Sequence, residues 1–207
     1  MISLEEYKKD PCGALSIPYY KAKRIALPEG LMIENEKELS ALPEGLKGER
    51  YFRLFHDLRG VKKPESAAFS LRAAGEEDIP LIASIIARSY EDMGISEAGL
   101  RALRMEPEFS PELWIVAFER AGGAPAACGI AAFDKEAGEG ALEWIQTLPE
   151  YRRRGAGRLV VRELLYRLSA FADFATVSGR ADDPLSPERL YRSCGFQGDN
   201  IWHVIRR

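Results

Sequence analysis

The stretch Leu148-Pro-Glu-Tyr-Arg-Arg-Arg-Gly-Ala-Gly-Arg158 separates two segments with different hydrophobic periods. The residues before it, 143–147, read as a strand, and the residues after Gly157 repeat with a helical period as far as Phe171. One apolar stripe with i, i+3, i+4 and i+7 spacing runs along this helix, formed by Val161, Leu164, Leu165 and Leu168. The sequence therefore predicts a strand, a glycine-containing turn and an amphipathic helix in direct succession.

The predicted turn has the properties of an anion-binding site. A helix start leaves backbone N–H groups unpaired and carries partial positive charge from the helix dipole. Gly155 and Gly157 lack side chains that would keep an anion away from the backbone, and six arginines lie between Arg152 and Arg167. These features indicate a pyrophosphate site. The alternative is a surface loop whose arginines are only solvated.

Two motifs in this part of the chain resemble those of a known family. Arg152-Arg-Arg-Gly155-Ala-Gly157 matches the Arg/Gln-x-x-Gly-x-Gly/Ala signature of the GNAT superfamily of N-acetyltransferases. Leu190-Tyr191-Arg-Ser-Cys-Gly195-Phe196, about 35 residues further on, is similar to the Leu-Tyr-x-x-x-Gly-Phe ending of that family. The resemblance covers roughly residues 69–207, and the following Trp202-His203 is similar to one bacterial branch. It implies an α+β fold, the GNAT fold, with a mixed, mostly antiparallel central sheet flanked by helices.

Composition limits the other function classes. The 207 residues suffice for one large domain or one domain with an extension, and 46% apolar residues can form a packed core. The net charge of -3 argues against binding to nucleic acid or an anionic membrane, and the arginine cluster from Arg152 to Arg158 is confined to one loop, which makes a nucleic-acid patch there a weak alternative. We find no apolar run of ~20 residues and no signal-peptide pattern at the acidic N-terminus. Three cysteines without metal-ligand spacing, Cys12, Cys128 and Cys194, favour a reduced cytoplasmic compartment and no metal site.

The sequence predicts an N-terminal extension, residues 1–67, packed on a catalytic domain, residues 68–207. The extension is interrupted by prolines. Its predicted elements are a helix at 4–9 and strands at 24–27 and 50–58. We expect the extension to dock through apolar surface that includes three aromatic residues, Tyr20, Phe52 and Phe55.

The catalytic domain alternates strands and helices in the order that the resemblance implies. Its predicted strands are 69–72, 113–118, 126–133, 141–147, 175–178 and 199–205. Its predicted helices are 79–93, 97–105, 158–171 and a last one that starts at Ser186. Asp78 and Ser186 are the predicted N-caps of the first and last of these helices.

The resemblance implies that acetyl-CoA is the co-substrate and that the strand end and the turn bind it. The residues that match this role are Thr147, Leu148, Arg152, Arg153, Arg154, Gly155, Ala156, Gly157 and Arg158. Edge-strand amides near Thr147 and Leu148 would polarise the thioester carbonyl. Many relatives place an asparagine on the pantetheine arm, where this chain has Asp182-Asp183-Pro184 and so lacks the amide donor. The sequence leaves open whether Asp183 takes over this contact.

The resemblance also implies a base and an acid for the transfer. Glu143 matches a position that accepts a proton from the substrate amine, which an ammonium must lose before it can attack a thioester. The alternative for Glu143 is a solvated or salt-bridged strand residue. Tyr191 matches the tyrosine that protonates the departing thiolate, since a phenol with a pKa of ~10 is protonated at neutral pH. The alternative for Tyr191 is a core tyrosine with a satisfied hydroxyl.

Several other side chains have a structural interpretation. His56 and His203 are lone histidines, and Cys128 and Cys194 fit small buried positions. Three aromatic residues fit either a substrate pocket or the core: Tyr19, Tyr20 and Trp202. Regular alternation along 142–148 predicts that Glu143, Ile145 and Thr147 share one face of their strand.

The function that follows from the resemblance is transfer of an acetyl group from acetyl-CoA to a primary amine of a small molecule. The sequence leaves two alternatives open, a non-catalytic acyl-CoA sensor and a peptide or protein N-acetyltransferase. The expected partners are acetyl-CoA and the amine, without nucleic acid or membrane, and the expected state is a monomer or a homodimer.

Overall fold

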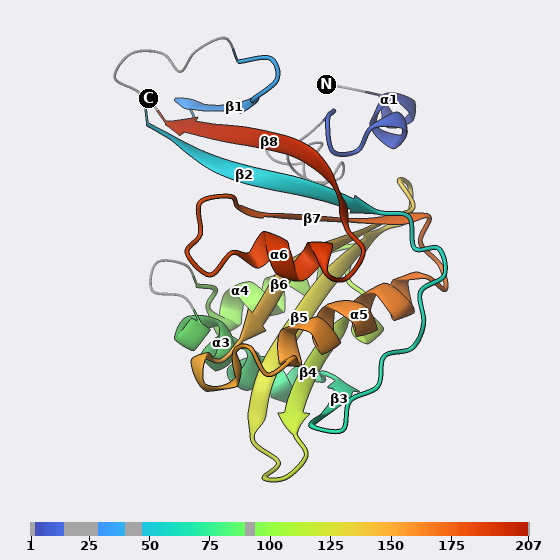
Figure 1. The fold of residues 1–207 in the computed structure, drawn as a ribbon, viewed down its shortest axis with the longest axis vertical. Coiled ribbons are helices and arrows are strands. Elements are labelled where there is room, and N and C mark those ends of the chain that lie inside the picture. The colour runs from blue at the N-terminus through green and yellow to red at the C-terminus, as the bar shows by residue number, and fades with distance from the viewer. Residues whose placement is uncertain (1–2, 15–28, 40–46, 90–93, 207) are drawn as a thin grey trace. The chain divides into compact units, whose positions relative to one another are not determined.

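The computed structural model describes residues 3–14, 29–39, 47–89 and 94–206. The chain forms two compact units, one made of residues 1–57 together with 176–207 and the other of residues 58–175 (Figure 1). The first unit thus combines most of the predicted extension with the C-terminal part of the predicted catalytic domain. The predicted strand at 24–27, the residues Tyr19 and Tyr20, and the predicted helix end at 93 lie outside the described residues.

The unit of residues 58–175 contains a four-stranded antiparallel array. Its strands follow the order β6-β5-β4-β3. Their bounds are β3 (Phe69–Ala73), β4 (Trp114–Glu119), β5 (Pro125–Asp134) and β6 (Glu139–Thr147). The sequence predicted all four to within about two residues, because each combines apolar residues with a glycine-containing turn at one end or both.

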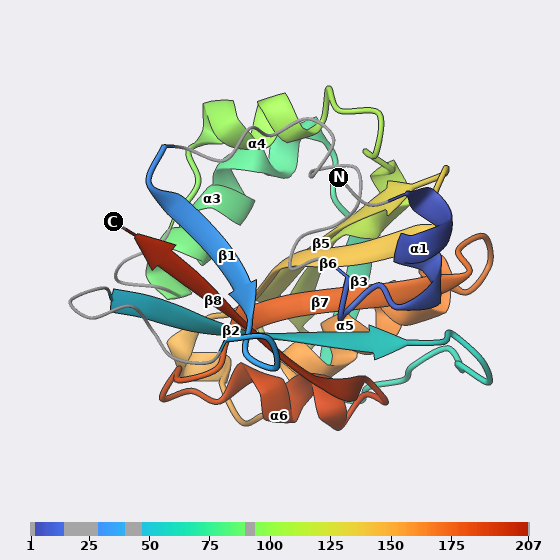
Figure 2. The ribbon, with the colours of Figure 1, turned by 90° about the horizontal axis from the view of Figure 1, so that it is seen from above.

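Helices cover both faces of this array. The helix α5 (Ala156–Leu168) lies on one face, and α3 (Ile79–Ser89) and α4 (Glu97–Leu103) lie on the other (Figures 1 and 2). Gly129 of β5 allows α5 to approach closely, since a side chain there would collide with Val160. The predicted apolar stripe of α5 is confirmed, because Val161, Leu164, Leu165 and Leu168 are all buried.

Short 3-10 turns precede two of these elements and one loop. They are η1 (Glu76–Asp78), η2 (Pro111–Leu113) and η3 (Pro149–Tyr151). The prediction that Asp78 is the N-cap of the following helix is wrong, because Asp78 is the last residue of η1 and its carboxylate bonds residues that precede it. Its carboxylate accepts hydrogen bonds from the Gly75 amide at 2.9 Å and from both terminal nitrogens of Arg72 at 2.6 and 2.7 Å. Arg72 lowers the pKa of the Asp78 carboxyl, and the Gly75 amide lowers it further.

The other unit places a strand from the extension between two C-terminal strands. Its strands follow the order β1-β8-β2-β7, with β1 and β2 both antiparallel to β8. Their bounds are β1 (Leu31–Asn35), β2 (Lys47–His56), β7 (Phe174–Arg180) and β8 (Gln197–Arg206). The helices of this unit are α1 (Leu4–Lys9) and α6 (Pro187–Arg192). The helix α1 and the strands β2, β7 and β8 were predicted, whereas β1 was not.

Both faces of β2 are buried. Phe52 and Leu54 are buried on one face, and Gly179 of β7 leaves room there for the Phe52 ring. Arg53, on the other face, is 1% exposed. Its guanidinium donates to the Pro11 carbonyl at 3.0 Å and to the Tyr7 hydroxyl at 2.8 Å. Phe52 was predicted to dock the extension. It is buried within β2, which is an interior strand of this unit between β8 and β7.

The N-terminal segment is held against this unit by buried polar contacts. Arg53 also donates to Ser178 and Thr176 of β7, at 3.2 and 3.3 Å. The indole N–H of Trp202 donates to the Cys12 carbonyl at 2.9 Å. Trp202 therefore has the structural role that the sequence left open. A buried arginine with several acceptors around it fixes α1 in one position, because leaving those groups unpaired in the interior would be costly.

Candidate functional site

The strand β6 is interrupted at the predicted base. Trp144 lies opposite Ile130 of β5, and Leu142 lies opposite the next residue, Ala131, so Glu143 is the extra residue of a β-bulge. A bulge bends the strand and redirects the side chain at the extra position, and it is frequent beside active sites. Glu143 is half-buried. The structure thus gives the predicted base a distinct backbone position that regular alternation did not indicate.

The bulge changes which residues share a face. Gly140 lies under Leu168 of α5, and Ile145 lies with Gly129 under the same helix. These two β6 residues are an odd number of positions apart, so a regular strand would place them on opposite faces. The predicted alternation over 142–148 therefore fails at its start. It holds only beyond the bulge, where Ile145 and Thr147 share a face.

Thr147 and Leu148 end β6 with their backbone groups pointing in opposite directions. The Leu148 amide donates to the Ala126 carbonyl of β5 at 3.0 Å, and the Leu148 carbonyl accepts from Tyr151 at 2.9 Å. Hydrogen-bonded pairs alternate along an antiparallel ladder, so the Thr147 amide and carbonyl point away from β5. The amide role predicted for both residues is therefore restricted to Thr147, because the Leu148 amide is already used.

The loop after β6 enters α5 through two left-handed residues. The turn η3 is followed by Arg152 in an extended conformation, Arg153 with φ 63° and Gly155 with φ 94°. Gly155 is the residue before α5, and the space around a side chain at this position is open. The first intrahelical bond of α5 runs from the Leu159 amide to the Gly155 carbonyl at 3.0 Å. The amides that precede Leu159 in the first turn are therefore the ones a bound anion can use.

Two of the loop arginines are engaged by the protein itself. Arg152 donates to the Ser89 carbonyl at the end of α3 at 2.9 Å. Arg154 pairs with Glu119 of β4, and its guanidinium lies 5.0 Å from the Tyr151 ring centroid. A third link, from Arg88 to Glu150 at 2.7 Å, joins α3 to η3. These contacts fix the loop, and the sequence did not indicate Ser89 or Glu119 because both are distant along the chain.

The other two loop arginines are exposed. Arg153 and Arg158 form no hydrogen bond or ion pair with any other residue in the described ranges. Arg153 lies at the left-handed corner of the loop, and Arg158 lies in the first turn of α5. Of the four arginines predicted to bind the cofactor, these two are both exposed and unpaired within the described ranges, whereas Arg154 is exposed but paired with Glu119. Ala156 and Gly157 are buried and can contribute only backbone groups.

Tyr191 lies in α6, in the unit of residues 1–57 and 176–207, whereas Glu143 and the whole loop belong to the unit of residues 58–175. The way α6 ends explains the spacing of the motif from Leu190 to Phe196. The Gly195 amide donates to the Arg192 carbonyl at 3.1 Å, and the Phe196 amide donates to the Tyr191 carbonyl at 3.2 Å, the pair of bonds of a Schellman motif. Gly195 has φ 101°, which favours glycine.

The ring of Tyr191 is 7% exposed and packs between two phenylalanines. Its centroid lies 6.0 Å from that of Phe52 and 5.8 Å from that of Phe196. The spacing from Tyr191 to Phe196 thus has a structural role in addition to the predicted chemical one. The packing fixes the ring, and with it the direction of the hydroxyl.

The loop after β7 uses its aspartates locally. The Asp183 carboxylate accepts from the Leu185 amide at 2.7 Å, and the Asp183 carbonyl accepts from the Ser186 amide at 2.8 Å. Asp182 pairs with Arg50 of β2 at 3.2 Å. The predicted N-cap Ser186 precedes α6 as expected, but its φ is 49° and its side chain makes no capping hydrogen bond. Pro187, at the first position of α6, supplies the helix start instead.

The two histidines have protein partners. His203 is buried in β8 and its Nε2 lies 3.3 Å from a carboxylate oxygen of Glu36. His56 is buried at the end of β2, with its ring 5.4 Å from that of Phe196.

The cysteines are unbridged and buried, as the sequence predicted for Cys128 and Cys194. Burial raises the pKa of the Cys128 thiol to about 12. No cluster of three His, Cys, Asp or Glu side chains in the described residues could hold a metal.

His56 gives the fold a pH dependence. Burial lowers the pKa of the imidazole below its usual 6.5, and the Asp57 charge and a hydrogen bond to the Cys194 backbone oppose this only in part. The unfolded chain therefore takes up the proton first as the pH falls. We expect the stabilisation from neutral His56 to be complete above pH ~6.5 and to decrease as the pH falls below it.

Urea unfolding of the parent and of His56→Gln, each at pH ~7.5 and pH ~5.5, measures this effect. The parent should lose more unfolding free energy over this interval than the variant, because carboxylate effects that both proteins share cancel in the comparison. Equal losses in the two proteins would contradict the prediction.

A family model for the acetyltransferase (GNAT) domain matches residues 110–198. The crystal structure of a GCN5-related N-acetyltransferase from Sphaerobacter thermophilus has a TM-score of 0.67 at 18% identity, over 79% of this chain and 53% of that chain. That of a putative GNAT acetyltransferase from Novosphingobium aromaticivorans has a TM-score of 0.59 at 19% identity, over 84% and 72%. No curated protein sequence matches significantly.

The N-terminal part of the chain is included in a further similarity. The crystal structure of a conserved protein of unknown function from Staphylococcus epidermidis covers 100% of this chain and 81% of its own, with a TM-score of 0.58 at 10% identity. The chain spans about half the length of the Sphaerobacter protein (53%). These likenesses show a shared fold, and the predicted mixed, mostly antiparallel architecture is confirmed.

Proposed function

We propose that this chain, which belongs to the GNAT superfamily, transfers an acetyl group from acetyl-CoA to a primary amine of a small molecule. The observation that carries the proposal is the loop that enters α5. Gly155 leaves the loop backbone open, two exposed arginines flank it, and the first-turn amides follow directly. This arrangement suits the pyrophosphate of coenzyme A. Acetyl-CoA supplies an activated thioester to the reaction.

In the proposed complex, the chain holds the two ends of the cofactor differently. The amides from Arg153 to Arg158 and the side chains of Arg153 and Arg158 bind the pyrophosphate. The Thr147 amide, which points away from β5, donates to the thioester carbonyl and stabilises negative charge on that oxygen during attack. Arg152 and Arg154 support the loop through Ser89 and Glu119 without contacting the ligand.

The chemical step uses one base and one acid. Glu143, at the bulge, accepts a proton from the substrate ammonium directly or through water, which creates the amine lone pair. The amine nitrogen then bonds to the acetyl carbon, and the carbon–sulfur bond breaks. Tyr191 donates its phenolic proton to the departing thiolate. The nitrogen releases its remaining extra proton, which returns to the Tyr191 phenolate through solvent, so the products are the amide and coenzyme A. The buried ring and the Schellman motif support this role by fixing the tyrosine.

A thiol-release assay with acetyl-CoA and a panel of primary amines tests the proposed reaction, and single-turnover kinetics of two variants test the roles. Tyr191→Phe retains the ring packing, so we expect the rate of the chemical step to fall ~10²–10⁴-fold with little change in acetyl-CoA affinity. Glu143→Gln replaces the carboxylate with an amide that cannot take up the proton. This variant should therefore lose the acidic limb of the pH–rate profile.

The control for both variants is Tyr166→Phe, which removes a hydroxyl from a partly exposed tyrosine on α5 and should leave the rate unchanged. Turnover of Tyr191→Phe at the parent rate would exclude the acid role. Tight binding of acetyl-CoA without thiol release for any amine would favour the sensor instead. Release with peptide N-termini alone would favour the peptide N-acetyltransferase.

No helix in the described part of the chain has the length and apolar character needed to cross a membrane. We propose a cytoplasmic location from the three unbridged cysteines. We also propose that the protein acts as a monomer or homodimer without nucleic acid, and that residues 1–67 form an extension of the catalytic domain at 68–207.

A further inference from the structure

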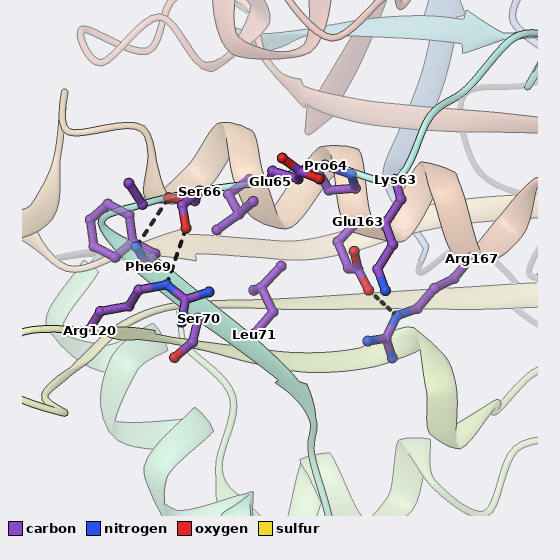
Figure 3. Close-up of a pocket in the computed structure, with 12 residues that line it drawn as sticks. Lys63, Pro64, Glu65, Ser66, Phe69, Ser70, Leu71, Arg120, Glu163 and Arg167 are labelled. Atoms are coloured by element: carbon purple, nitrogen blue, oxygen red, sulfur yellow. Dashed lines mark hydrogen bonds and ion pairs between the residues drawn. The ribbon is translucent and has the colours of Figure 1, made fainter.

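A groove of about 700 Å³ lies in the unit of residues 58–175, on the α5 side of β3 (Figure 3). The segment 63–67, strand β3 and one flank of α5 form its walls, and we call it the β3 groove. Its lining includes none of the residues 147–158 that the proposed function uses. The groove therefore shares no lining residue with the proposed cofactor loop, which adjoins it where the Arg154 guanidinium lies 5.9 Å from the Phe69 ring centroid.

The backbone of β3 presents hydrogen-bonding groups to this groove. β3 is the last strand in the order β6-β5-β4-β3, so one of its edges has no neighbouring strand among the described residues. The Arg120 amide donates to the Ala68 carbonyl at 2.9 Å, and the Ala74 amide donates to the Trp114 carbonyl at 2.7 Å. Because bonded pairs alternate in an antiparallel ladder, Leu71 points its N–H and C=O away from β4.

The side chains around this edge are mainly apolar at the centre and cationic at the ends. Figure 3 shows Leu71 between Arg120 at one end and Lys63 with Arg167 at the other. Lys63 forms no ion pair or hydrogen bond within the described residues. Arg120 uses its Nε on the Ser66 carbonyl at 3.1 Å, which leaves its terminal nitrogens for a ligand.

The acids of the groove only partly balance these charges. Glu163 is buried, and its carboxylate accepts from Arg167 Nε at 2.9 Å. Arg167 also donates through Nη1 to the Glu112 carbonyl at 2.7 Å, so its Nη2 remains. Glu65 is the other acid in the lining. Glu163 and Arg167 neutralise each other, which leaves Lys63 and Arg120 against Glu65 and gives the lining an excess of one positive charge. This excess favours an anionic ligand.

We propose that the β3 groove binds an extended acidic peptide segment of a partner protein. The segment adds to the edge of β3 as a further strand, with its backbone on the Leu71 N–H and C=O and its carboxylates on Lys63, Arg120 and Arg167. Only another extended backbone complements the two edge groups of Leu71 together, and the cations at the ends select acidic side chains.

Binding of a synthetic peptide to the full chain tests this proposal. The probe is N-acetyl-Glu-Val-Glu-Val-Glu-amide, and its basic counterpart with lysine in place of glutamate is the comparison. Titration calorimetry gives the affinity, and the backbone NMR signal of Leu71 locates the site. We expect saturable binding of the acidic peptide, a shift of the Leu71 amide signal and weaker binding of the basic peptide.

Matched variants distinguish the contribution of the β3 edge to peptide binding from that of the cationic side chains. Leu71→Pro removes the outward N–H without removing a hydrogen bond to β4. It should lower the affinity for the acidic peptide by about tenfold. Leu71→Ala keeps the N–H and should bind better than Leu71→Pro. Lys63→Gln should weaken binding, whereas Arg162→Gln, an exposed α5 residue outside the groove lining, should not.

Two results would overturn the proposal. One is the absence of saturable binding by the acidic peptide, and the other is equal affinity for the parent and a folded Leu71→Pro variant. Thermal melts of each variant establish folding first. The titrations contain no acetyl-CoA, so their outcome is independent of the proposed transfer reaction.

Discussion

A chain that starts at Ser66 should not form the unit that contains Tyr191. This truncation removes β1 and β2, so β8 loses both of its antiparallel partners and β7 loses its β2 neighbour. It also removes Phe52 from the Tyr191 ring. The exposed apolar surface should make the truncated protein poorly soluble and inactive. Circular dichroism melts measure the stability of the truncated protein, and sedimentation measures its aggregation.

A shorter truncation is the matched control. A chain that starts at Glu29 keeps β1 and β2 but loses α1, whose Tyr7 hydroxyl accepts from Arg53. It should fold and melt at a lower temperature than the parent, because Arg53 loses buried partners. If the chain that starts at Ser66 melts like the full chain and keeps its activity, β2 has no structural role in this unit.

Gly155→Asp should reduce acetyl-CoA affinity more than any other single substitution in the loop. The added side chain has open space, so the loop can accept it at the expense of strain at φ 94°. Its carboxylate would lie beside the proposed pyrophosphate. Repulsion at ~5 Å is worth about 1–3 kcal/mol per phosphate charge. Calorimetry should therefore show that the affinity for acetyl-CoA falls by at least about tenfold.

Gly155→Asn is the control for this substitution. Asparagine has nearly the same size and suffers the same backbone strain, but it adds no charge. We expect its affinity to fall much less than that of Gly155→Asp. Equal effects of the two substitutions would attribute the loss to strain, and unchanged affinity in Gly155→Asp would remove the loop from the cofactor site.

The parts of the fold that the sequence predicted are those with strong local periodicity. The apolar stripe of α5 and the strands β3 to β6 are examples, because each repeats over several residues. β1 was missed because its pairing partner, β8, lies far away along the chain. The N-cap at Asp78 failed because Arg72, from the neighbouring strand, bonds its carboxylate.

The candidate site was predictable only where a backbone requirement leaves a mark in the sequence. Gly155 and Gly195 both have positive φ, and both were found through their motifs. The bulge at Glu143 has no glycine or proline to indicate it. Among the described residues, Arg154 is paired and Arg153 is not, because only Arg154 reaches Glu119 of β4. Such long-range contacts cannot be read from neighbouring residues.

The position of β2 has a consequence for how the chain folds. Lys47 of β2 lies opposite Arg206 of β8, so this pairing joins residues about 160 positions apart. During synthesis, β2 emerges before residues 174–206 and has neither β7 nor β8 to pair with until they have been made. Pairings of such long range fold slowly and leave an apolar strand exposed in the meantime. Residues 58–175 can form their own array first, and the unit of residues 1–57 and 176–207 then closes last.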